Sequence, residues 1–334
     1  MRQGIRVLVT GGTGFVGNVI CRRLWDRRYK ICAPIRNKRH ATGGLIRPNI
    51  ELWQTGDLSN FRSWERVVQG NEVVIHLVAR THVTDEHGDV LGTYRAVNVE
   101  ITRRLAQAAV REGVRHFIYM SSIKAVGNGC QQPYDEANEC DPEDSYGITK
   151  LEAERELVSL LHDTSCRLTI LRPPLVYGPG VRGNFLRLLR LVNKGIPFPA
   201  ISNARSMVHV ENLADSVLTC IDSAAAFDEI FHVADETPMS TSDLIRAMSE
   251  GMQRNPRLVP VPGPMLTKLG QAFGRGEEIK RLAGSLTVST DKIRRVLGWI
   301  PRVTTEQGVR QTSLAFLNHP WTEDGYSEST RKAA

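Results

Sequence analysis

Short apolar runs recur along the first half of the chain, and each is followed by a segment with helical spacing of apolar side chains. Residues 5–10 form the first such run, and the helical pattern after it continues to Leu24. The same reasoning predicts strands at 29–35, 50–55, 73–78, 115–120 and 168–171, and helices at 59–69, 93–110 and 145–157. Strands that alternate with helices indicate an α/β fold with a doubly wound parallel sheet.

The pattern becomes less regular after residue 178. Short helices are predicted at 184–192, 212–222, 242–252 and 265–282, separated by connections rich in proline and glycine. We therefore predict a first domain over residues 1–178, to which some later segments return, and a smaller part over 179–317 that closes over the sheet and selects a second substrate. For the tail, residues 318–334, we expect disorder.

Composition and charge narrow the class of protein. The chain has 334 residues, of which 41% are hydrophobic and 24% charged, as in ordinary globular proteins. No apolar run is long enough for a membrane span, so we expect a cytoplasmic protein without membrane insertion. Six cysteines without close pairing predict reduced thiols, and we predict no metal site. The net charge of +7 is spread along the chain with few interleaved aromatics, which favours small anions over nucleic acid as partners.

A glycine-rich turn lies between the first predicted strand and helix, with glycines at positions 11, 14 and 17. In a dinucleotide-binding turn the first glycine allows the tight bend, the second lets the backbone approach a pyrophosphate, and the third lets helix pack on strand. The phosphates then bind the N–H groups at the helix N-terminus. Gly11 and Gly14 are one residue further apart than in the usual fingerprint, and a structural turn without a ligand is the alternative.

The end of the second predicted strand bears on which dinucleotide would bind. A carboxylate is expected there when the ribose has a free 2′-hydroxyl, but none occurs before Glu51. Arg36 and Arg39 would suit a 2′-phosphate, because guanidinium can bind two phosphate oxygens. We therefore favour NADP(H) over NAD(H), although an ordinary basic loop is the alternative. Asp57, after the third strand, either accepts from the adenine amino group or caps the next helix.

Tyr146 and Lys150 are four residues apart and leave the same face of a predicted helix. A free tyrosine has a pKa near ~10 and must lose about three units, roughly 4 kcal/mol, to exchange protons near pH 7. An ammonium about 4 Å away supplies roughly that much in a partly dry cleft. Ser122 is the candidate that would hold a reacting oxygen, with Ser121 the weaker one. The alternative is a chance pair on a solvated helix.

Several motifs in order resemble one known family: Thr10–Gly17, Asp57–Leu58, Ser121–Ser122, Tyr146–Lys150 and Arg172–Pro179. Together they resemble the extended short-chain dehydrogenases/reductases, and within them the nucleotide-sugar epimerases and reductases, over about residues 5–315. The resemblance implies that Tyr146 is the acid/base, that Lys150 binds the nicotinamide ribose and lowers the tyrosine pKa, and that Ser122 anchors the reacting oxygen. It also implies cofactor contacts from Gly11, Gly14, Phe15, Val16, Gly17, Asp57, Leu58, Leu77, Ala79, Asn98, Lys150 and Pro173.

On the substrate side, the resemblance implies that Arg205 grips a nucleotide diphosphate. Asn184 and Phe185 stand where the family has a helix that contacts the diphosphate and the nucleobase, and Arg281 is a candidate second diphosphate arginine. A surface salt bridge is the alternative for each arginine. The resemblance also implies a homodimer that forms through two helices per subunit, including the helix of Tyr146.

Two departures from the family bear on the reaction. Ile123 and Lys124 replace the acid and base that the 4,6-dehydratases use, so we do not expect dehydration. Lys124 either contacts a substituent of the substrate or is solvated. Pro174 and Leu175 stand where the family has a substrate asparagine, which alters the expected pose of the sugar.

These features predict an enzyme that acts at C4 of a UDP-linked hexose, N-acetylated or 6-deoxy. The general resemblance favours a 4-epimerase, and Arg36 favours a 4-keto reductase that consumes NADPH. Two alternatives remain: a reductase of a steroid or flavonoid ketone, and a non-catalytic dinucleotide-sensing protein on the same fold.

Overall fold

A seven-stranded sheet forms the centre of the protein, for which a computed structural model describes residues 4–37, 45–81, 88–261, 284–322 and 325–326. The strand order is β10-β6-β5-β4-β1-β2-β3 and every neighbouring pair is parallel. This confirms the predicted doubly wound parallel sheet. The strands are β1 (Arg6–Thr10), β2 (Lys30–Ile35), β3 (Ile50–Gln54), β4 (Val73–His76), β5 (His116–Met120), β6 (Arg167–Arg172) and β10 (Glu229–His232).

Helices cover both faces of the sheet, and the alternation of side chains along each strand assigns the faces. Val7 and Val9 belong to one buried cluster, whereas Leu8 between them belongs to another. The first cluster includes side chains of α1 (Phe15–Asp26), α7 (Val210–Asp222) and α11 (Asp291–Leu297). The second includes side chains of α2 (Trp64–Val68), α4 (Glu100–Arg111) and α5 (Ser145–Leu161). Apolar residues therefore fill both faces, as a parallel sheet requires.

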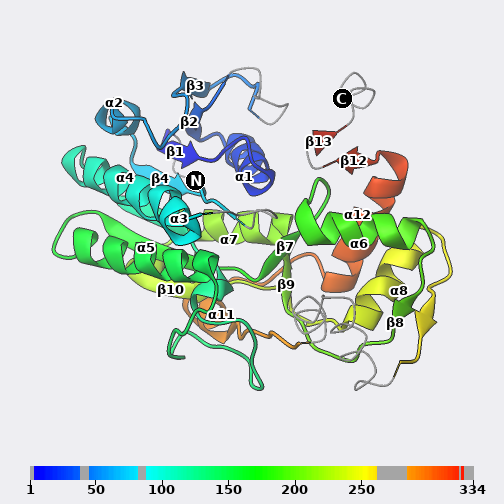
Figure 1. The fold of residues 1–334 in the computed structure, drawn as a ribbon. Helices are drawn as coiled ribbons and strands as arrows, with labels where there is room; N and C mark the ends of the chain where they lie inside the picture. Colours follow the sequence, from blue (N-terminus) through cyan, green and yellow to red (C-terminus); the bar gives the residue numbers. More distant parts are fainter. Residues whose placement is uncertain (1–3, 38–44, 82–87, 262–283, 323–324, 327–334) are drawn as a thin grey trace.

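The helix predicted over 93–110 is two helices in the structure. These are α3 (Val90–Asn98) and α4, with Val99 between them. The break places the Asn98 side chain against the backbone of Arg80, after β4, and the Asn98 amide accepts from the Arg80 N–H at 2.7 Å. Both helices lie beside α5 on the same side of the sheet (Figure 1).

Part of the chain beyond residue 178 returns to the sheet. β10 pairs with β6 in parallel, and α7 packs against α1, where Glu211 and Asp215 form ion pairs with arginines of α1. The phenol of Tyr29 donates to Asp222 at the end of α7, at 2.7 Å. The sequence pattern did not predict β10, which is only four residues long.

A second lobe lies beside the sheet and is built mainly from α6 (Gly183–Asn193), α8 (Thr241–Gly251) and α12 (Thr305–Asn318) (Figure 1). These helices share one apolar cluster with the residues after α12. Trp321 is 2% exposed and its indole N–H donates to the Val181 carbonyl at 2.7 Å. The stretch for which we expect disorder thus contributes a packed side chain to the lobe.

Pairs of short strands lie outside the main sheet. β7 (Leu175–Tyr177) pairs with β9 (Met207–His209), and β8 (Phe198–Pro199) pairs with β11 (Leu258–Val259). The remaining described elements are η2 (Ile123–Ala125), η3 (Ala224–Ala226), β12 (Trp321–Thr322) and β13 (Gly325–Tyr326). Among the residues that the structure describes, no helix has the length and apolarity needed to cross a bilayer.

Candidate active site

The glycine turn after β1 is closed by a hydrogen bond from the Gly14 N–H to the Gly11 carbonyl at 3.0 Å. Gly11 has φ +76°, a conformation that glycine adopts without strain. A Cβ on Gly17 would overlap the Gly11 carbonyl oxygen and the Gly12 Cα, so α1 approaches the turn as closely as backbone allows. Gly14 precedes the first residue of α1 and is exposed. The turn over residues 11–17 therefore leaves a space at a helix N-terminus that a side chain would fill. We call it the glycine cradle, and it fits a dinucleotide pyrophosphate.

Most of the other predicted cofactor residues lie around this cradle. Phe15 and Val16 open α1, and they pack toward the second lobe and the sheet core respectively. Leu77 and Ala79 directly follow β4 and are partly exposed. These residues lie at the carboxyl ends of central strands, where a parallel sheet binds its ligands.

Asn98 and Pro173, two further predicted cofactor residues, are buried. Asn98 is 0% exposed, and its amide group bonds to both backbone groups of Arg80 and to the Thr149 hydroxyl. This side chain thus links α3 to the segment after β4, and its predicted cofactor contact stays a prediction. Pro173 is buried after β6, and its carbonyl accepts from the Ile123 N–H at 3.0 Å.

Arg36 follows β2 directly and is exposed, with its charge close enough to contribute to the lowered pKa of Asp57. The larger cause of that lowering is hydrogen bonding from Ser59, whose N–H donates to Asp57 at 2.9 Å. Asp57 does not cap a helix, because α2 begins only at Trp64. Leu58 packs against the sheet core. Glu51 pairs with Arg6 at the amino end of β3, away from the cradle, and Arg39 lies outside the described residues.

Ser122 and Tyr146 are brought together by the contact between η2 and the start of α5. A Cβ on Gly147 would overlap the Lys124 carbonyl oxygen, so the two elements meet at backbone distance. The Ser122 hydroxyl bonds to the Tyr146 phenol and lowers its pKa, but burial dominates and raises the pKa of Tyr146 to about 12. Tyr146 is therefore a neutral phenol near pH 7.

Lys150 lies one helical turn below Tyr146 and is 1% exposed. Its ammonium donates to the Met120 carbonyl at 2.7 Å and to the Tyr119 phenol at 3.2 Å. Burial lowers the pKa of Lys150 to about 7, and Glu154 opposes the shift. We expected Lys150 to lower the Tyr146 pKa, but the structure shows the opposite direction for the tyrosine, because burial outweighs every favourable neighbour.

A buried ion pair supports this corner of the site. Arg172, at the end of β6, donates to Glu154 through Nε at 3.0 Å and through Nη2 at 2.6 Å, and both residues are almost fully buried. The Ser121 hydroxyl also donates to Glu154. Ser121 is thus committed to the ion pair, which leaves Ser122 as the serine that faces Tyr146. Sequence reasoning missed Glu154, although its position four residues after Lys150 places it on the same helix face.

Lys124 joins η2 to the N-terminus of α5. Its amine lies 3.3 Å from Asp144, the residue that caps α5 by accepting from the Gly147 N–H at 2.8 Å, and it also donates to Asn128. Its side chain is 25% exposed, so it is neither fully solvated nor fully sealed. Ile123 is buried in a small apolar cluster and offers no acidic or basic group.

The structure separates the predicted substrate residues. Asn184 is exposed at the start of α6, whereas Phe185 is 2% exposed and stacks on Tyr177 with ring centroids 5.4 Å apart. Phe185 belongs to the apolar core of the lobe, and its predicted substrate contact stays a prediction. Arg205 is partly exposed and donates to the Gly284 carbonyl at 2.9 Å. Arg281 lies outside the described residues.

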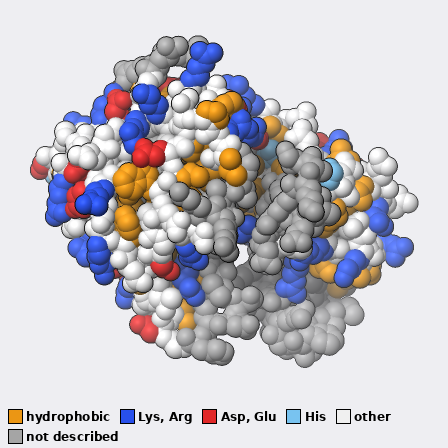
Figure 2. All heavy atoms as spheres, turned by 90° about the horizontal axis from the view of Figure 1, so that it is seen from above, with side chains coloured by type: hydrophobic (Ala, Val, Ile, Leu, Met, Phe, Trp, Pro, Cys, Tyr) orange, Lys and Arg blue, Asp and Glu red, His pale blue; other side chains and the backbone are white. Residues whose placement is uncertain are grey.

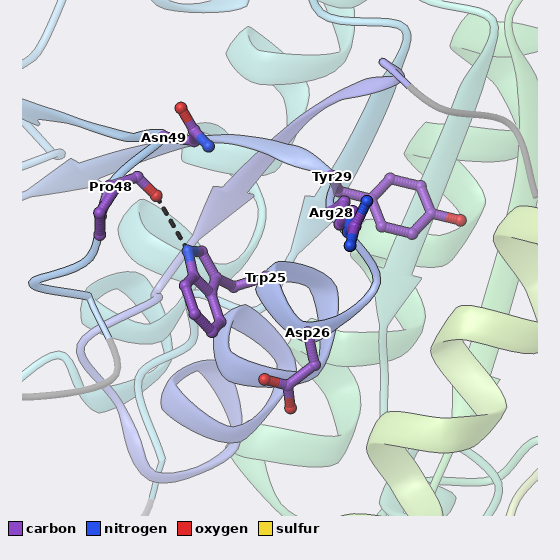
Figure 3. A pocket seen from close by; sticks show the side chains of 6 residues that line it. All are labelled: Trp25, Asp26, Arg28, Tyr29, Pro48 and Asn49. Carbon is purple, nitrogen blue, oxygen red and sulfur yellow. Dashed lines mark hydrogen bonds between the residues drawn. The ribbon is translucent and has the colours of Figure 1, made fainter.

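A cavity of about 400 Å³ lies elsewhere, at the amino edge of the sheet (Figure 3). Its lining comes from the end of α1, including Trp25, and from the turn before β3, where Pro48 accepts from the Trp25 indole at 2.9 Å. Ser122, Tyr146 and Lys150 do not line this cavity. No group of three or more possible metal ligands occurs among the described residues. On the face shown in Figure 2, basic side chains are interspersed with acidic ones.

The arrangement supports proton exchange beside a bound dinucleotide. A phenol and a serine hydroxyl meet at the sheet's carboxyl edge, after β5, with an ammonium below them, and the glycine cradle follows β1, which β4 separates from β5. Such a set can move a proton to or from an oxygen while a hydride moves on the adjacent carbon.

Comparison with known proteins agrees with this geometry. The family model for the NAD dependent epimerase/dehydratase family matches residues 7–234. UDP-glucose 4-epimerase of Vibrio cholerae is 38% identical over 318 residues, which cover 93% of this chain and 95% of that protein. An Escherichia coli O157:H7 4-epimerase of N-acetyl-α-D-glucosaminyl-diphospho-ditrans,octacis-undecaprenol is 28% identical, with 80% and 78% covered.

Solved structures show the same fold. UDP-glucuronic acid 4-epimerase from Bacillus cereus, in complex with NAD, has a TM-score of 0.77 at 18% identity, covering 93% of this chain and 96% of that one. UDP-glucose 4-epimerase from Thermotoga maritima, with UDP-glucose, has a TM-score of 0.75 at 20% identity, covering 94% and 99%. With its glycine cradle and its Ser122, Tyr146 and Lys150 set, this chain belongs to the NAD-dependent epimerase/dehydratase family, within the extended short-chain dehydrogenases/reductases.

Proposed function

We propose that this protein is a nucleotide-sugar 4-epimerase that acts on a UDP-linked hexose. The observation that carries the proposal is the Ser122, Tyr146 and Lys150 set, which lies beside a glycine cradle in a chain similar over nearly its whole length to a UDP-glucose 4-epimerase. The similar solved epimerases with bound UDP-sugars support the same substrate class.

Each residue has a defined task in this proposal. The nicotinamide supplies a hydride acceptor that returns the hydride to C4. The phenolate form of Tyr146, which the positive charge of a bound NAD⁺ would favour, would take the proton from the C4 hydroxyl and give it back, and Ser122 would hold that oxygen by a hydrogen bond. Lys150 binds the ribose of the cofactor, and the glycine turn binds the pyrophosphate. Arg205 and Asn184 bind the diphosphate and the nucleoside, in the lobe that selects the substrate.

The proposed 4-epimerase activity can be tested with the purified protein and with a Tyr146 variant. Purified protein should interconvert UDP-glucose and UDP-galactose, or their N-acetylated forms, without net consumption of cofactor. Tyr146→Phe should lower kcat at least 1,000-fold and leave the melting temperature and NAD affinity nearly unchanged, because the ring remains and only the hydroxyl is lost. Full activity in this variant would overturn the proposal.

A 4-keto reductase is the second candidate function, and two observations favour it. Arg36 is exposed at the end of β2, with no carboxylate at that strand end, which suits an exchangeable NADPH. Tyr146 is protonated near pH 7, as donation to a 4-keto oxygen requires. A UDP-linked 4-keto-6-deoxy sugar would then oxidise added NADPH one for one, whereas an epimerase would leave NADPH unchanged.

The cofactor preference can be tested separately. The family and its solved relatives use NAD, and we propose that Arg36 nevertheless gives this chain a preference for NADP(H). Titration of NADH and NADPH by fluorescence would measure both affinities. Arg36→Ala should weaken NADPH about 10-fold and leave NADH unchanged, since only NADPH carries the 2′-phosphate.

Two further features of the function are proposals of the same kind. Relatives that act on an N-acetylglucosaminyl substrate and on dTDP-L-rhamnose support an N-acetylated or 6-deoxy sugar here, with Lys124 next to the substituent.

We propose a homodimer that pairs α4 and α5, where Val158 is 51% exposed. Val158→Glu should convert the dimer to a monomer in sedimentation velocity.

A further inference from the structure

A buried chain of hydrogen bonds runs from the strand before the glycine turn to Lys150. The Thr10 hydroxyl lies 2.6 Å from Nδ1 of His76, and Nε2 of His76 lies 2.9 Å from the Thr102 hydroxyl. Thr102 bonds to the Tyr119 phenol, which accepts from the Lys150 ammonium at 3.2 Å. Four elements supply these side chains: β1, β4, α4 and β5, with α5 contributing the lysine. None of the five side chains is more than 1% exposed.

The direction of every proton in this chain follows from one bond. The Thr102 hydroxyl donates to the Asn98 carbonyl at 2.7 Å, so its oxygen can only accept from its other partners. Burial lowers the pKa of His76 to about 3, so its ring is neutral. His76 must then carry its proton on Nε2 and donate to Thr102, which leaves Nδ1 to accept from Thr10.

Tyr119 is fixed by the same logic. Its hydroxyl proton goes to Thr102, so a lone pair of its oxygen is turned toward Lys150. The phenol ring stacks on His76, with centroids 5.8 Å apart, and lies beneath the Lys150 ammonium. An ammonium has three N–H donors, and the Met120 carbonyl and the Tyr119 oxygen take two of them. The direction of the third donor is then set.

We propose that Tyr119 is a positioning residue of the reaction, which holds the Lys150 ammonium charged and aims its third N–H at the bound cofactor. His76 and Thr102 determine which way the Tyr119 hydroxyl points. The proposal rests on the proposed function only for its kinetic readout, because the titration of Lys150 can be measured in the protein without a substrate.

Several titratable or charged groups surround Lys150 and enter the expected pH dependence. They are Tyr146 and Glu154 on α5, Tyr119 on β5, His76 on β4, and Arg172 on β6, which acts through Glu154. Tyr119 is a neutral phenol, because burial and the negative charge of Glu154 raise its pKa. Glu154 is the nearby anion, and its charge is shared with Arg172. The Tyr119 oxygen therefore accepts a hydrogen bond from the charged lysine but carries no negative charge of its own.

Tyr119→Phe keeps the ring and removes the acceptor. Loss of one hydrogen bond to a charged group should move the titration of Lys150 about one pH unit lower. The measurement is ¹³C NMR of protein labelled at the lysine ε-carbons, with Lys150 assigned by its absence in Lys150→Arg. Tyr29→Phe is the matched control, because it removes a buried phenol that donates to Asp222 near the amino edge of the sheet (Figure 3).

The kinetic readout follows from the same shift. Lys150 should be about half charged at pH 7 in the unaltered protein and about one tenth charged in Tyr119→Phe, so kcat/KM at pH 7 should fall about five-fold. The fall in kcat/KM should be larger at higher pH, where the charged fraction of Lys150 differs by a larger factor between the two proteins. An unchanged Lys150 titration in Tyr119→Phe, or an equal shift in Tyr29→Phe, would overturn the proposal even if epimerase activity is present.

Thr102→Val provides a second variant should Tyr119→Phe fail to fold. It leaves the Tyr119 hydroxyl in place but removes the acceptor of its proton, which can then turn toward Lys150. The Lys150 titration should again move lower, by less than in Tyr119→Phe. A shift to higher pH would contradict the proton order derived above. Absence of activity on any nucleotide sugar, with the NMR shifts as expected, would reject the proposed function and leave the role of Tyr119 standing.

Discussion

The two halves of the site differ in how tightly the fold holds them. On the sheet side, Gly17 meets the backbone of the turn without room for a methyl group, and Lys150 is 1% exposed with its amine held by β5. On the lobe side, Asn184 is exposed and Arg205 is partly exposed. The side to which we assign proton and hydride chemistry is thus fixed by close backbone contacts and buried hydrogen bonds. The side chains to which we assign substrate recognition are at least partly exposed, so substitutions there should cost less stability.

The largest effect should come from Gly17→Ala. The new methyl group would overlap the Gly11 carbonyl oxygen, so the turn or α1 must move. We expect a loss of at least ~4 kcal/mol in the free energy of unfolding, together with loss of NAD binding. Urea unfolding and NADH fluorescence measure the two quantities. Gly70→Ala is the control, since Gly70 has φ +73° but open space around it, and should cost only ~1 kcal/mol.

The buried ion pair comes next. Glu154→Leu leaves the Arg172 guanidinium buried without its carboxylate, which should destabilise the protein by about 3–5 kcal/mol. The double variant Glu154→Leu, Arg172→Met should recover much of that loss, because no uncompensated charge remains. Urea unfolding of the three proteins tests this. Equal stability of the single and double variants would show that the pair is not desolvated as the structure indicates.

Sequence pattern predicted the sheet side well for a physical reason. Apolar strands buried on both faces and a glycine turn that excludes side chains leave a local mark, so β1 to β6, the cradle and the Tyr146 helix could be located from the chain alone. Lys150 and Ser122 followed from their spacing to Tyr146. What escaped was contact between distant segments, such as the partners of Asn98, β10 beside β6, and the histidine and threonine behind Tyr119.

The lobe side was harder to predict. Phe185 lies on the buried face of α6, and helical spacing alone does not tell which apolar residue enters a core and which faces a ligand. The pKa of Tyr146 was assigned from the presence of Lys150, whereas the fold directs that amine to Tyr119 and the Met120 carbonyl. The burial of Phe185 and the placement of the Lys150 amine both depend on neighbours that are remote in sequence.

The sheet side should also carry a pH dependence of stability. His116 is buried on β5, bonds to Thr169 at 2.7 Å, and burial lowers its pKa to about 4 from an ordinary value of 6.5. Between these two pKa values, His116 therefore binds a proton in the unfolded chain but not in the folded chain. His116 should lower the free energy of unfolding as pH falls from about 6.5 to about 4, by about 2 kcal/mol at pH 5.

His116→Gln removes this titration and keeps a hydrogen-bonding group. The loss of stability between pH 7 and pH 5 should become about 2 kcal/mol smaller than in the unaltered protein. Urea unfolding at both pH values measures it. His162→Gln, at an exposed position after α5, controls for the general effect of replacing a histidine. An unchanged pH dependence in His116→Gln would mean that the ring becomes protonated within the fold.

The smallest effect should come from the lobe side, where Arg205→Ala removes the proposed diphosphate contact, far from the reacting carbon. Such a contact is made equally in the ground state and the transition state, so KM for the nucleotide sugar should rise about 10-fold while kcat stays within about two-fold. Arg257→Ala, which removes an exposed arginine of the same lobe, should change neither constant. Tyr146→Phe should show the reverse split, with kcat lost and KM nearly kept. A fall in kcat for Arg205→Ala would mean that the lobe also aligns the sugar for reaction, and the division between a chemical half and a recognition half would not hold.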